Sequence, residues 1–324
     1  MKQSGLGQRP LQPPQLSRPG RPSRPARPVR RGPSGRVQPV AYLYLLPAFS
    51  FFAVFAVAPL AHAFKLSFYE WNGITDQVWV GLDNYVTVFT DPNVRAALWN
   101  SVILIVFYAA LPICVALVIV GLMARVRIRG RTAFRAVLFV PTILPLTVVA
   151  VAWRWVYAPD GPLNFGLDLI GLDFVSRAWL GDFTFALPAM GTVGTWVTFG
   201  LVFVLFAAGV QKIPSELYES ARLDGANMVR EFFAVTLPAL RGEITVALIL
   251  TVTAALRNFD LVFVMTRGGP GTNTEVPSMF IYRSVFQIRS IGLGAAIGVI
   301  LMLELLAVNL AVLWYRRRGG DLSA

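Results

Sequence analysis

Cysteine, histidine and lysine are nearly missing from this sequence of 324 residues. It contains one Cys (Cys114), one His (His62) and three Lys (Lys2, Lys65 and Lys212). A single Cys excludes an intramolecular disulfide, and so few soft ligands leave no basis for a zinc or haem site. No Lys follows a Gly, which excludes a phosphate-binding loop ending in Gly-Lys. We therefore expect no metal, no other cofactor and no ATP site in this chain.

Charged residues are also scarce. They make up 14% of the chain against 56% hydrophobic residues, and the mean hydropathy is +0.61. A soluble protein carries about 25% charged residues, because its surface must be wetted. The composition therefore argues against a soluble globular enzyme and predicts an integral membrane protein.

Acidic residues are absent before Glu70, and residues 1–39 form a tail of nine prolines, eight arginines and one lysine. Proline interrupts helices and like charges repel, so we expect a disordered tail. A basic arm can bind nucleic acid through phosphates, but the first aromatic residue is Tyr42, so the tail cannot stack on bases. We interpret it as a cytoplasmic tail beside acidic lipid headgroups, and not as a cleavable signal peptide.

Six apolar segments follow the tail, and about 20 apolar residues suffice to cross a bilayer as a helix. The predicted spans are 42–64, 101–124, 134–156, 185–209, 244–266 and 291–315. Pro112, Pro141 and Pro145 are expected to kink the second and third spans. The expected fold is therefore all-α, with a transmembrane domain at 40–324.

The basic residues indicate the orientation of these spans. With both termini inside, the inner segments 1–41, 125–135, 210–243 and 316–324 carry 21 of the 29 Lys and Arg, and the outer segments carry six. Basic residues favour the cytoplasmic side. We therefore predict that both termini are cytoplasmic, and that the net charge of +12 requires no nucleic-acid partner.

The long inner loop, residues 211–238, is predicted to hold two short helices at the membrane surface. Ser215 is a suitable N-cap, with Glu216 and Glu219 near the positive end of the first helix. Gly225 is suited to the left-handed conformation that ends it.

The second helix of this loop follows Gly225 directly. We expect Asp224 to cap it and Pro238 to break it before the fifth span. Four apolar residues are expected to face the membrane: Val229, Phe232, Phe233 and Val235.

The same loop carries a spaced motif: Glu219-Ser-Ala221, Gly225 four residues later, and Val-Thr-Leu-Pro ending at Pro238. It closely resembles the EAA loop of ABC-importer permeases, although an ordinary interfacial helix is the alternative. The resemblance implies a coupling helix seated in a cleft of a cytoplasmic ATPase. The implied coupling residues are Glu219, Ser220, Ala221, Asp224, Gly225, Leu237 and Pro238, with Ser220 replacing the usual Ala.

The resemblance extends over residues 42–315 and is similar in detail to carbohydrate permeases of the maltose and glycerol-phosphate type. The matching segments are Gly81–Tyr85, Arg131–Pro141 with Trp153–Trp155, Gly161–Asn164, Ile213–Ala226 and Thr266–Gly271. It implies the type I ABC-importer permease fold with a core at 95–315, in a bacterial inner membrane. It also implies three partners: a second permease subunit, a dimeric ATPase that uses the ATP, and an extracytoplasmic solute-binding protein.

Four ionisable residues lie at membrane depth: Arg154, Arg257, Asp260 and Glu304. Such residues are costly in lipid and usually face a cavity or the inside of a bundle. Arg257 and Asp260 are three residues apart in the fifth predicted span, where they could partly neutralise each other. These groups line either a polar path for a solute or contacts between helices.

In maltose-type permeases, the sugar contacts come from the spans on either side of the coupling loop. The resemblance places those contacts at Gly194, Val197, Thr198, Leu201, Thr251, Ala254, Ala255 and Asn258. Asn258 keeps an amide, whereas Gly194 and Ala255 replace amides, and Leu201 and Ala254 replace aromatic residues. Trp196 is shared with the family, either for packing or for contact. The same sugar in the same pose is therefore not expected.

These features favour the membrane subunit of an ATP-driven importer of a sugar or oligosaccharide. The same machine importing a polyol, glycerol phosphate or another small polar solute is the alternative. A membrane enzyme would need a cluster of catalytic groups on its loops, which the sequence lacks. Half of a secondary transporter is disfavoured because no internal repeat is present.

Overall fold

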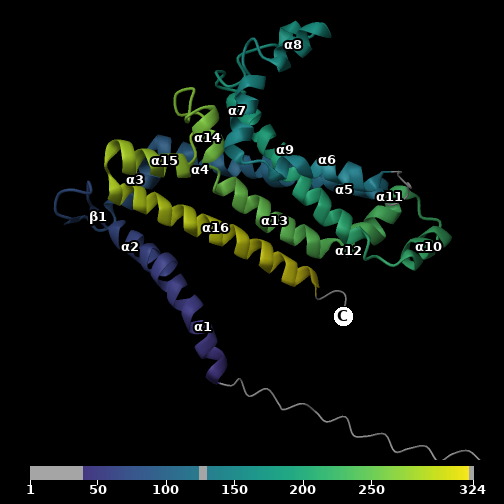
Figure 1. Cartoon of the computed structure of the whole chain (residues 1–324), viewed down its shortest axis with the longest axis horizontal. Helices are drawn as coiled ribbons and strands as arrows, with labels where there is room; N and C mark the ends of the chain where they lie inside the picture. The colour runs from purple at the N-terminus through teal and green to yellow at the C-terminus, as the bar shows by residue number, and fades with distance from the viewer. Residues whose placement is uncertain (1–38, 124–129, 321–324) are drawn as a thin grey trace, which may run out of the picture. The chain divides into compact units, whose positions relative to one another are not determined.

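The computed structural model of the chain describes residues 39–123 and 130–320 (Figure 1). Residue contacts divide the chain into two compact units between Phe52 and Ala53, and each unit is described by itself. The described part of the first unit is helix α1 (Pro39–Phe52). The predicted tail, apart from Pro39, lies outside the described residues, as do residues 125–129 of the inner loop predicted at 125–135.

Helices account for most of the second unit. Its α-helices are α2 (Ala58–Leu66), α3 (Asp83–Thr90), α4 (Pro92–Ile105), α5 (Leu111–Met123), α6 (Arg131–Ile143), α7 (Leu146–Val156), α8 (Pro162–Leu169), α9 (Ala186–Val210), α10 (Ser215–Leu223), α11 (Met228–Glu231), α12 (Leu237–Ala239), α13 (Arg241–Leu256), α14 (Asp260–Met265), α15 (Pro277–Tyr282) and α16 (Ile291–Gly320). The π-helical segments are η1 (Ala53–Val57), η2 (Val106–Ala110), η4 (Phe232–Thr236) and η5 (Arg283–Ile288), and η3 (Asp173–Val175) is a 3₁₀ turn.

Five of the described helical stretches are long and apolar enough to cross a membrane. They are Tyr44–Leu66, Pro92–Met123, Ala186–Val210, Arg241–Met265 and Ile291–Arg316. A bent pair, Ala133–Ile143 and Leu146–Val156, makes a sixth if it is counted as one span. The predicted helical, multi-pass fold class is confirmed, although the second span begins at Pro92 and not at residue 101.

The third predicted span is broken and not merely kinked. The axes of α6 and α7 differ by 96°. Leu144 adopts an extended conformation (φ −70°, ψ 138°) between them. The ring of Pro145 disfavours the helical conformation at the preceding residue, which explains the break. Pro141 lies inside α6, two residues before its end.

The fifth predicted span is also interrupted. Helix α13 ends at Leu256 and α14 begins at Asp260, so Arg257 and Asp260 lie on opposite sides of a turn. The expectation that these two residues share one helix is therefore wrong. No ion pair joins their side chains, both of which are described.

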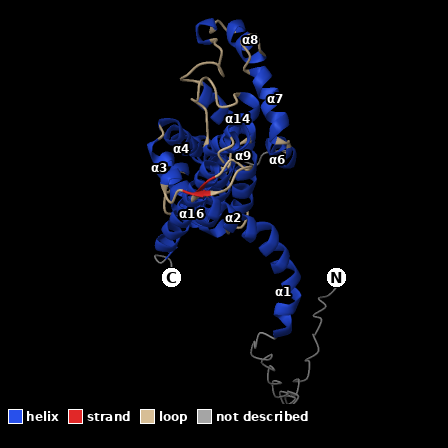
Figure 2. Ribbon diagram, turned by 90° about the vertical axis from the view of Figure 1, so that its left-hand side faces the viewer, coloured by secondary structure: helices blue, strands red, loops and turns tan. Residues whose placement is uncertain are grey.

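A short antiparallel hairpin departs from the all-helical prediction. Strands β1 (Tyr69–Glu70) and β2 (Val78–Trp79) pair with Tyr69 opposite Trp79, and they appear in red in Figure 2. Two-residue strands are too short to leave a pattern of alternating hydrophobicity. The hairpin therefore left no signal in the sequence.

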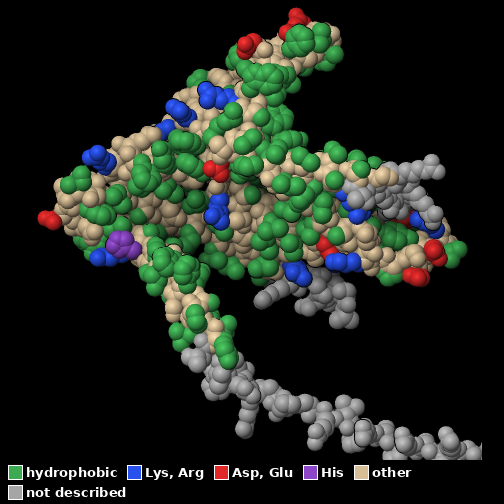
Figure 3. Space-filling model, viewed as in Figure 1, with side chains coloured by type: hydrophobic (Ala, Val, Ile, Leu, Met, Phe, Trp, Pro, Cys, Tyr) green, Lys and Arg blue, Asp and Glu red, His purple; other side chains and the backbone are tan. Residues whose placement is uncertain are grey.

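Helix α9 supplies much of the core, because it packs against α5, α6 and η2. One buried cluster lies toward the N-terminal end of α9 and includes Tyr108 and Met190, and a second lies toward its C-terminal end and includes Phe203 and Phe206. Hydrophobic side chains also cover much of the face shown in Figure 3. Such a surface is stable in lipid, whereas a soluble protein rarely exposes a large apolar patch.

Candidate functional site: the inner loop and the intramembrane path

The first helix of the inner loop, α10, ends at a left-handed glycine. Gly225 has a φ of +79°. Its amide donates to the Arg222 carbonyl at 3.0 Å, and the Ala226 amide donates to the Ala221 carbonyl at 2.9 Å. These bonds satisfy carbonyl groups that the helix end leaves open. The conformation predicted for Gly225 is confirmed.

The predicted caps of these helices are wrong. Pro214 is the N-cap residue of α10, and Ser215 is already helical. Asp224 has a φ of −75° and a ψ of 5° at the end of α10, so it cannot cap the next helix. Asn227 has the extended backbone that a cap requires, and its side chain accepts the Arg230 amide at 2.9 Å.

Pro238 does not end the second helix as predicted. It lies within α12, and the helical path runs on to Leu240. The preceding segment η4 is π-helical, with the Leu237 amide donating to the Phe232 carbonyl. Because Pro238 has no N–H, the chain adapts in the turn before it without stopping.

An ion pair braces the two helices of the loop. Arg222 on α10 donates from Nε to Oε2 of Glu231 at 3.1 Å and from Nη2 to Oε1 at 3.4 Å. Glu231 is 3% exposed, and the bond to Glu231 raises the pKa of Arg222. The Tyr218 hydroxyl also lies 3.2 Å from that of Thr236. This brace leaves no signal in the sequence, because the two ion-pair partners are nine residues apart on different helices.

The braced helix α10 presents its other side chains outward. It has no buried residue. Glu219, Ser220 and Asp224 are exposed, and Leu223 is 89% exposed. Ala221, Leu237 and Pro238 are half-buried. An exposed helix that combines leucines with carboxylates is suited to docking against another protein.

The loop is also joined to the membrane spans. The Phe232 ring packs so closely on Gly121 of α5 that a Cβ there would lie 2.8 Å from its Cδ2 atom. The Lys212 ammonium lies 3.2 Å from Oε1 of Glu243 on α13. Phe232 therefore faces α5, whereas Val229 and Phe233 are more than half exposed.

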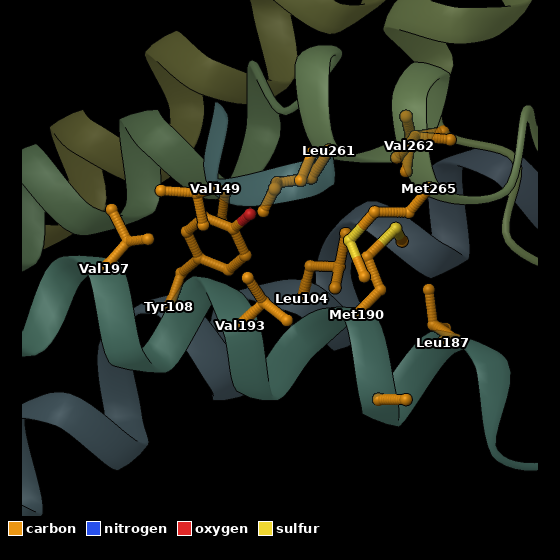
Figure 4. Packing of buried hydrophobic residues seen from close by; sticks show 14 of the residues in the cluster. Leu104, Tyr108, Val149, Leu187, Met190, Val193, Val197, Leu261, Val262 and Met265 are labelled. Atoms are coloured by element: carbon orange, nitrogen blue, oxygen red, sulfur yellow. The ribbon is translucent and has the colours of Figure 1, made fainter. Parts of the chain in front are cut away.

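The structure brings together part of the predicted solute path. Gly194 and Thr198 of α9 both contact Tyr108, and Val197 and Ala255 belong to the same buried cluster. Figure 4 shows Val197 and Tyr108 within this cluster. The path therefore converges on a tyrosine that the sequence analysis did not single out. One feature of the sequence could have identified Tyr108: it is the one tyrosine in the second predicted span.

The remaining path residues differ in how far they are buried. Leu201 is half-buried and Ala254 is exposed. The Thr251 hydroxyl donates to the Ala247 carbonyl of its own helix. Asn258 is 5% exposed at the break after α13, and its backbone carbonyl accepts the Ser278 hydroxyl at 2.7 Å.

No ion pair joins any two of the four charges predicted at membrane depth, all of which lie in the described part of the chain. Arg154 is exposed in the last turn of α7, and Arg257 and Asp260 are exposed at the break in the fifth span. Glu304 is half-buried on α16, where the Ser101 hydroxyl lies 3.4 Å from its Oε1. Trp196 is 40% exposed, and its ring packs edge-on against Trp153.

Comparisons with known proteins show the family of this chain. The family model described as "Binding-protein-dependent transport system inner membrane component" matches residues 116–318. A probable ABC transporter permease of Bacillus subtilis is 35% identical over 87% of this chain and 97% of its own. The diacetylchitobiose uptake permease of Streptomyces coelicolor is 35% identical over 83% of this chain and 80% of its own.

A solved structure supports the same fold. A chain of a bacterial ABC transporter that imports the acidic polysaccharide alginate is 26% identical, with a TM-score of 0.73 over 86% of this chain and 95% of that one. The family match covers more than half of this sequence, and the relatives are matched over most of their length. The chain therefore belongs to the binding-protein-dependent transport system inner membrane components, the permease family of ABC importers.

Proposed function

We propose that this chain is a membrane-spanning subunit of an importer that moves a sugar or oligosaccharide into the cytoplasm, driven by ATP hydrolysis on a separate subunit. The observation that carries the proposal is α10, an exposed helix on the predicted cytoplasmic side with the spacing of a coupling loop. Its outward carboxylates and leucines would dock on the ATPase, while the chain itself hydrolyses nothing.

Movement of α10 would reach the spans through the contacts already described. The Arg222–Glu231 ion pair joins α10 to α11, and Phe232 follows Glu231 and packs on Gly121 of α5. A rigid brace transmits displacement better than a loose loop, because packed elements shift as units. The ATPase would thereby act on the second span, which contains Tyr108.

Three partners complete the proposed machine in a bacterial inner membrane. A second permease of the same family would share the path, two ATPase copies would bind the two coupling loops, and a binding protein would deliver the solute. Both termini would lie in the cytoplasm. The excess of basic residues in the inner segments supports this orientation.

A carbohydrate is the favoured solute, because the named relatives handle diacetylchitobiose and alginate. The hydroxyl of Thr198 and the amide of Asn258 offer polar groups to such a molecule. A polyol or glycerol phosphate remains the second candidate. It is supported by the loss of side chains at Gly194, Ala254 and Ala255, which leaves fewer groups for a large sugar.

Reconstitution tests the proposal. The complete importer, with its binding protein outside and ATP on the ATPase side, is placed in proteoliposomes and offered radiolabelled diacetylchitobiose, maltose, glycerol and glycerol 3-phosphate. We expect ATP-dependent uptake of a saccharide that ceases without this chain. Uptake of glycerol or glycerol 3-phosphate without uptake of either saccharide supports a polyol or glycerol phosphate as the solute. Uptake of none of the four compounds contradicts the proposed function.

A further inference from the structure

Tyr108 lies in a part of the second span whose backbone is rearranged. The segment η2 is π-helical, and the Leu111 amide donates to the Val106 carbonyl in place of the Phe107 carbonyl. Pro112 has no N–H, so it cannot pair with the Tyr108 carbonyl four residues earlier. Two successive carbonyls, those of Phe107 and Tyr108, are thus released from the helix. Short π segments of this kind often occur at functional sites.

The hydroxyls of two threonines of α9 lie within hydrogen-bond distance of these two carbonyls. The Thr195 hydroxyl donates to the Phe107 carbonyl at 2.6 Å, and the Thr198 hydroxyl lies 3.1 Å from the Tyr108 carbonyl and 2.8 Å from the Gly194 carbonyl of its own helix. Hydroxyl side chains commonly satisfy backbone groups freed by proline in membrane helices. The two threonines therefore fix the backbone at Tyr108, and they are positioning residues.

The facing helix leaves room for the Tyr108 ring. A Cβ at Gly194 would overlap the ring, so α9 can approach it only through a glycine. Figure 4 shows the ring among Val149, Val193 and Leu261, with its hydroxyl oxygen pointing toward Leu261. Leu261 belongs to the first turn of α14, directly after the break in the fifth span. The hydroxyl is thus aimed toward the interruption of the fifth span.

The Tyr108 hydroxyl has no hydrogen-bond partner among the described residues, although the side chain is only 3% exposed. Nδ2 of Asn258, at the break of the fifth span, is also buried without a partner in the described chain. A buried unpaired polar group costs about 1–3 kcal/mol, and a phenylalanine would fill the same space without this cost. The hydroxyl is therefore unfavourable for packing, and it calls for an explanation in function.

We propose that Tyr108 is a solute-contacting residue that determines specificity, a proposal that rests on the proposed function. When α9 separates from α14 during transport, the hydroxyl would bond to a hydroxyl of the passing saccharide, and the ring would pack on an apolar face of the sugar. An aromatic ring with a polar end suits a ligand with both surfaces. Tyr108 would thereby supply the aromatic contact that is lost at Leu201 and Ala254.

Tyr108→Phe isolates the hydroxyl. In the reconstituted importer, with the saccharide that wild type transports among diacetylchitobiose and maltose, we expect uptake at low concentration to fall about 3- to 10-fold, the effect of one neutral hydrogen bond. Assembly with the partner subunits should be unchanged, and the melting temperature equal or higher. A deoxy analogue that lacks the contacted hydroxyl should be imported equally by both proteins.

Tyr157→Phe is the matched control, because the Tyr157 hydroxyl lies 3.1 Å from the Ala189 carbonyl and 2.7 Å from the Thr192 hydroxyl. It should lower stability without changing the preference between the sugar and its deoxy analogues. Unchanged uptake by Tyr108→Phe where wild type transports the saccharide overturns the inference alone. So does loss of assembly, since a hydroxyl without a partner cannot hold the fold. Failure of wild type to transport any saccharide contradicts the proposed function instead.

Discussion

The backbone conformation at position 225 is by itself enough to favour glycine there. Its φ of +79° lies in the left-handed region, yet a Cβ there would meet no atom within 4 Å. The constraint is therefore conformational and not steric. It acts at the end of the helix that we propose to dock on the ATPase, so the direction of α10 depends on it.

Gly225→Val should misdirect α10 without unfolding the spans. A residue with a Cβ costs about 1–2 kcal/mol in this conformation, and Asn tolerates it better. We expect normal membrane insertion, weakened co-purification of the ATPase and lost uptake, with Gly225→Asn close to wild type. If Gly225→Val transports normally with its ATPase still bound, α10 is not the coupling element.

Glu275, in the loop between α14 and α15, is fully buried, and we expect it to make the stability of the protein depend on pH. Burial raises the pKa of its carboxyl, and this effect is only partly offset by Arg283, whose Nη1 donates to Oε2 at 2.9 Å. The fold thus favours the protonated acid. The stabilisation is fully present below the ordinary pKa of 4.5 and is lost as the pH rises through the raised pKa.

The melting temperature of the detergent-solubilised protein should show this effect. Between about pH 4 and pH 8, wild type should lose stability relative to Glu275→Gln, whose side chain is neutral throughout. If the melting temperatures of the two proteins change in parallel with pH, the pKa of this carboxyl is the same in the folded and unfolded states.

At the scale of elements, three of the four π-helical segments in the described part of the chain follow a pattern. Among the described residues, η1, η2 and η4 each end two positions before a proline: Pro59, Pro112 and Pro238. Each proline removes one donor, and the preceding turn widens so that the helix continues. The freed carbonyls then need partners from neighbouring helices, as Thr195 and Thr198 provide for η2.

The bond from Thr198 to the Tyr108 carbonyl should matter only while Pro112 is present. Thr198→Val should destabilise the protein by about 1–3 kcal/mol, because it removes a buried hydroxyl that lies within hydrogen-bond distance of the Tyr108 and Gly194 carbonyls. In a Pro112→Ala background the new amide of residue 112 can pair with the Tyr108 carbonyl. Thr198→Val should therefore lower the free energy of unfolding by less in that background. Chemical unfolding of the four proteins measures this coupling.

Thr253→Val is the matched control for this cycle. The Thr253 hydroxyl donates to the Ile249 carbonyl at 2.6 Å within α13, far from Pro112 in the sequence. Thr253→Val should lower the free energy of unfolding by the same amount with Pro112 and with Pro112→Ala. Equal costs for Thr198→Val in both backgrounds would mean that Pro112 does not create the need for this bond.

At the scale of the whole molecule, the distribution of arginine predicts which loops face the cytoplasm. Single cysteines in a Cys114→Ser background test this, since the native thiol is exposed. Gly20→Cys, Gly130→Cys and Met228→Cys should resist an impermeant thiol reagent in intact cells. Phe174→Cys, in a predicted outer loop and 77% exposed, should react. Labelling at position 130 with protection at 174 would reverse the predicted orientation.

The sequence by itself determined the features that depend on local pattern. Apolar length determined the spans, the bias of basic residues gave the predicted orientation, and spacing located the inner loop and its left-handed Gly225. These signals are local, because lipid burial and backbone conformation act on each segment separately. The cap residues were misplaced within the same loop, since a boundary shift of a few residues moves the cap.

Only the tertiary structure decided which distant groups meet. The Arg222–Glu231 brace, the break that separates Arg257 from Asp260, and the convergence of Gly194 and Thr198 on Tyr108 leave no mark in periodicity. Proline predicted a disturbance near position 112, but not where the freed carbonyls would find donors. That depends on how α9 packs against the second span, and packing is a property of two helices together.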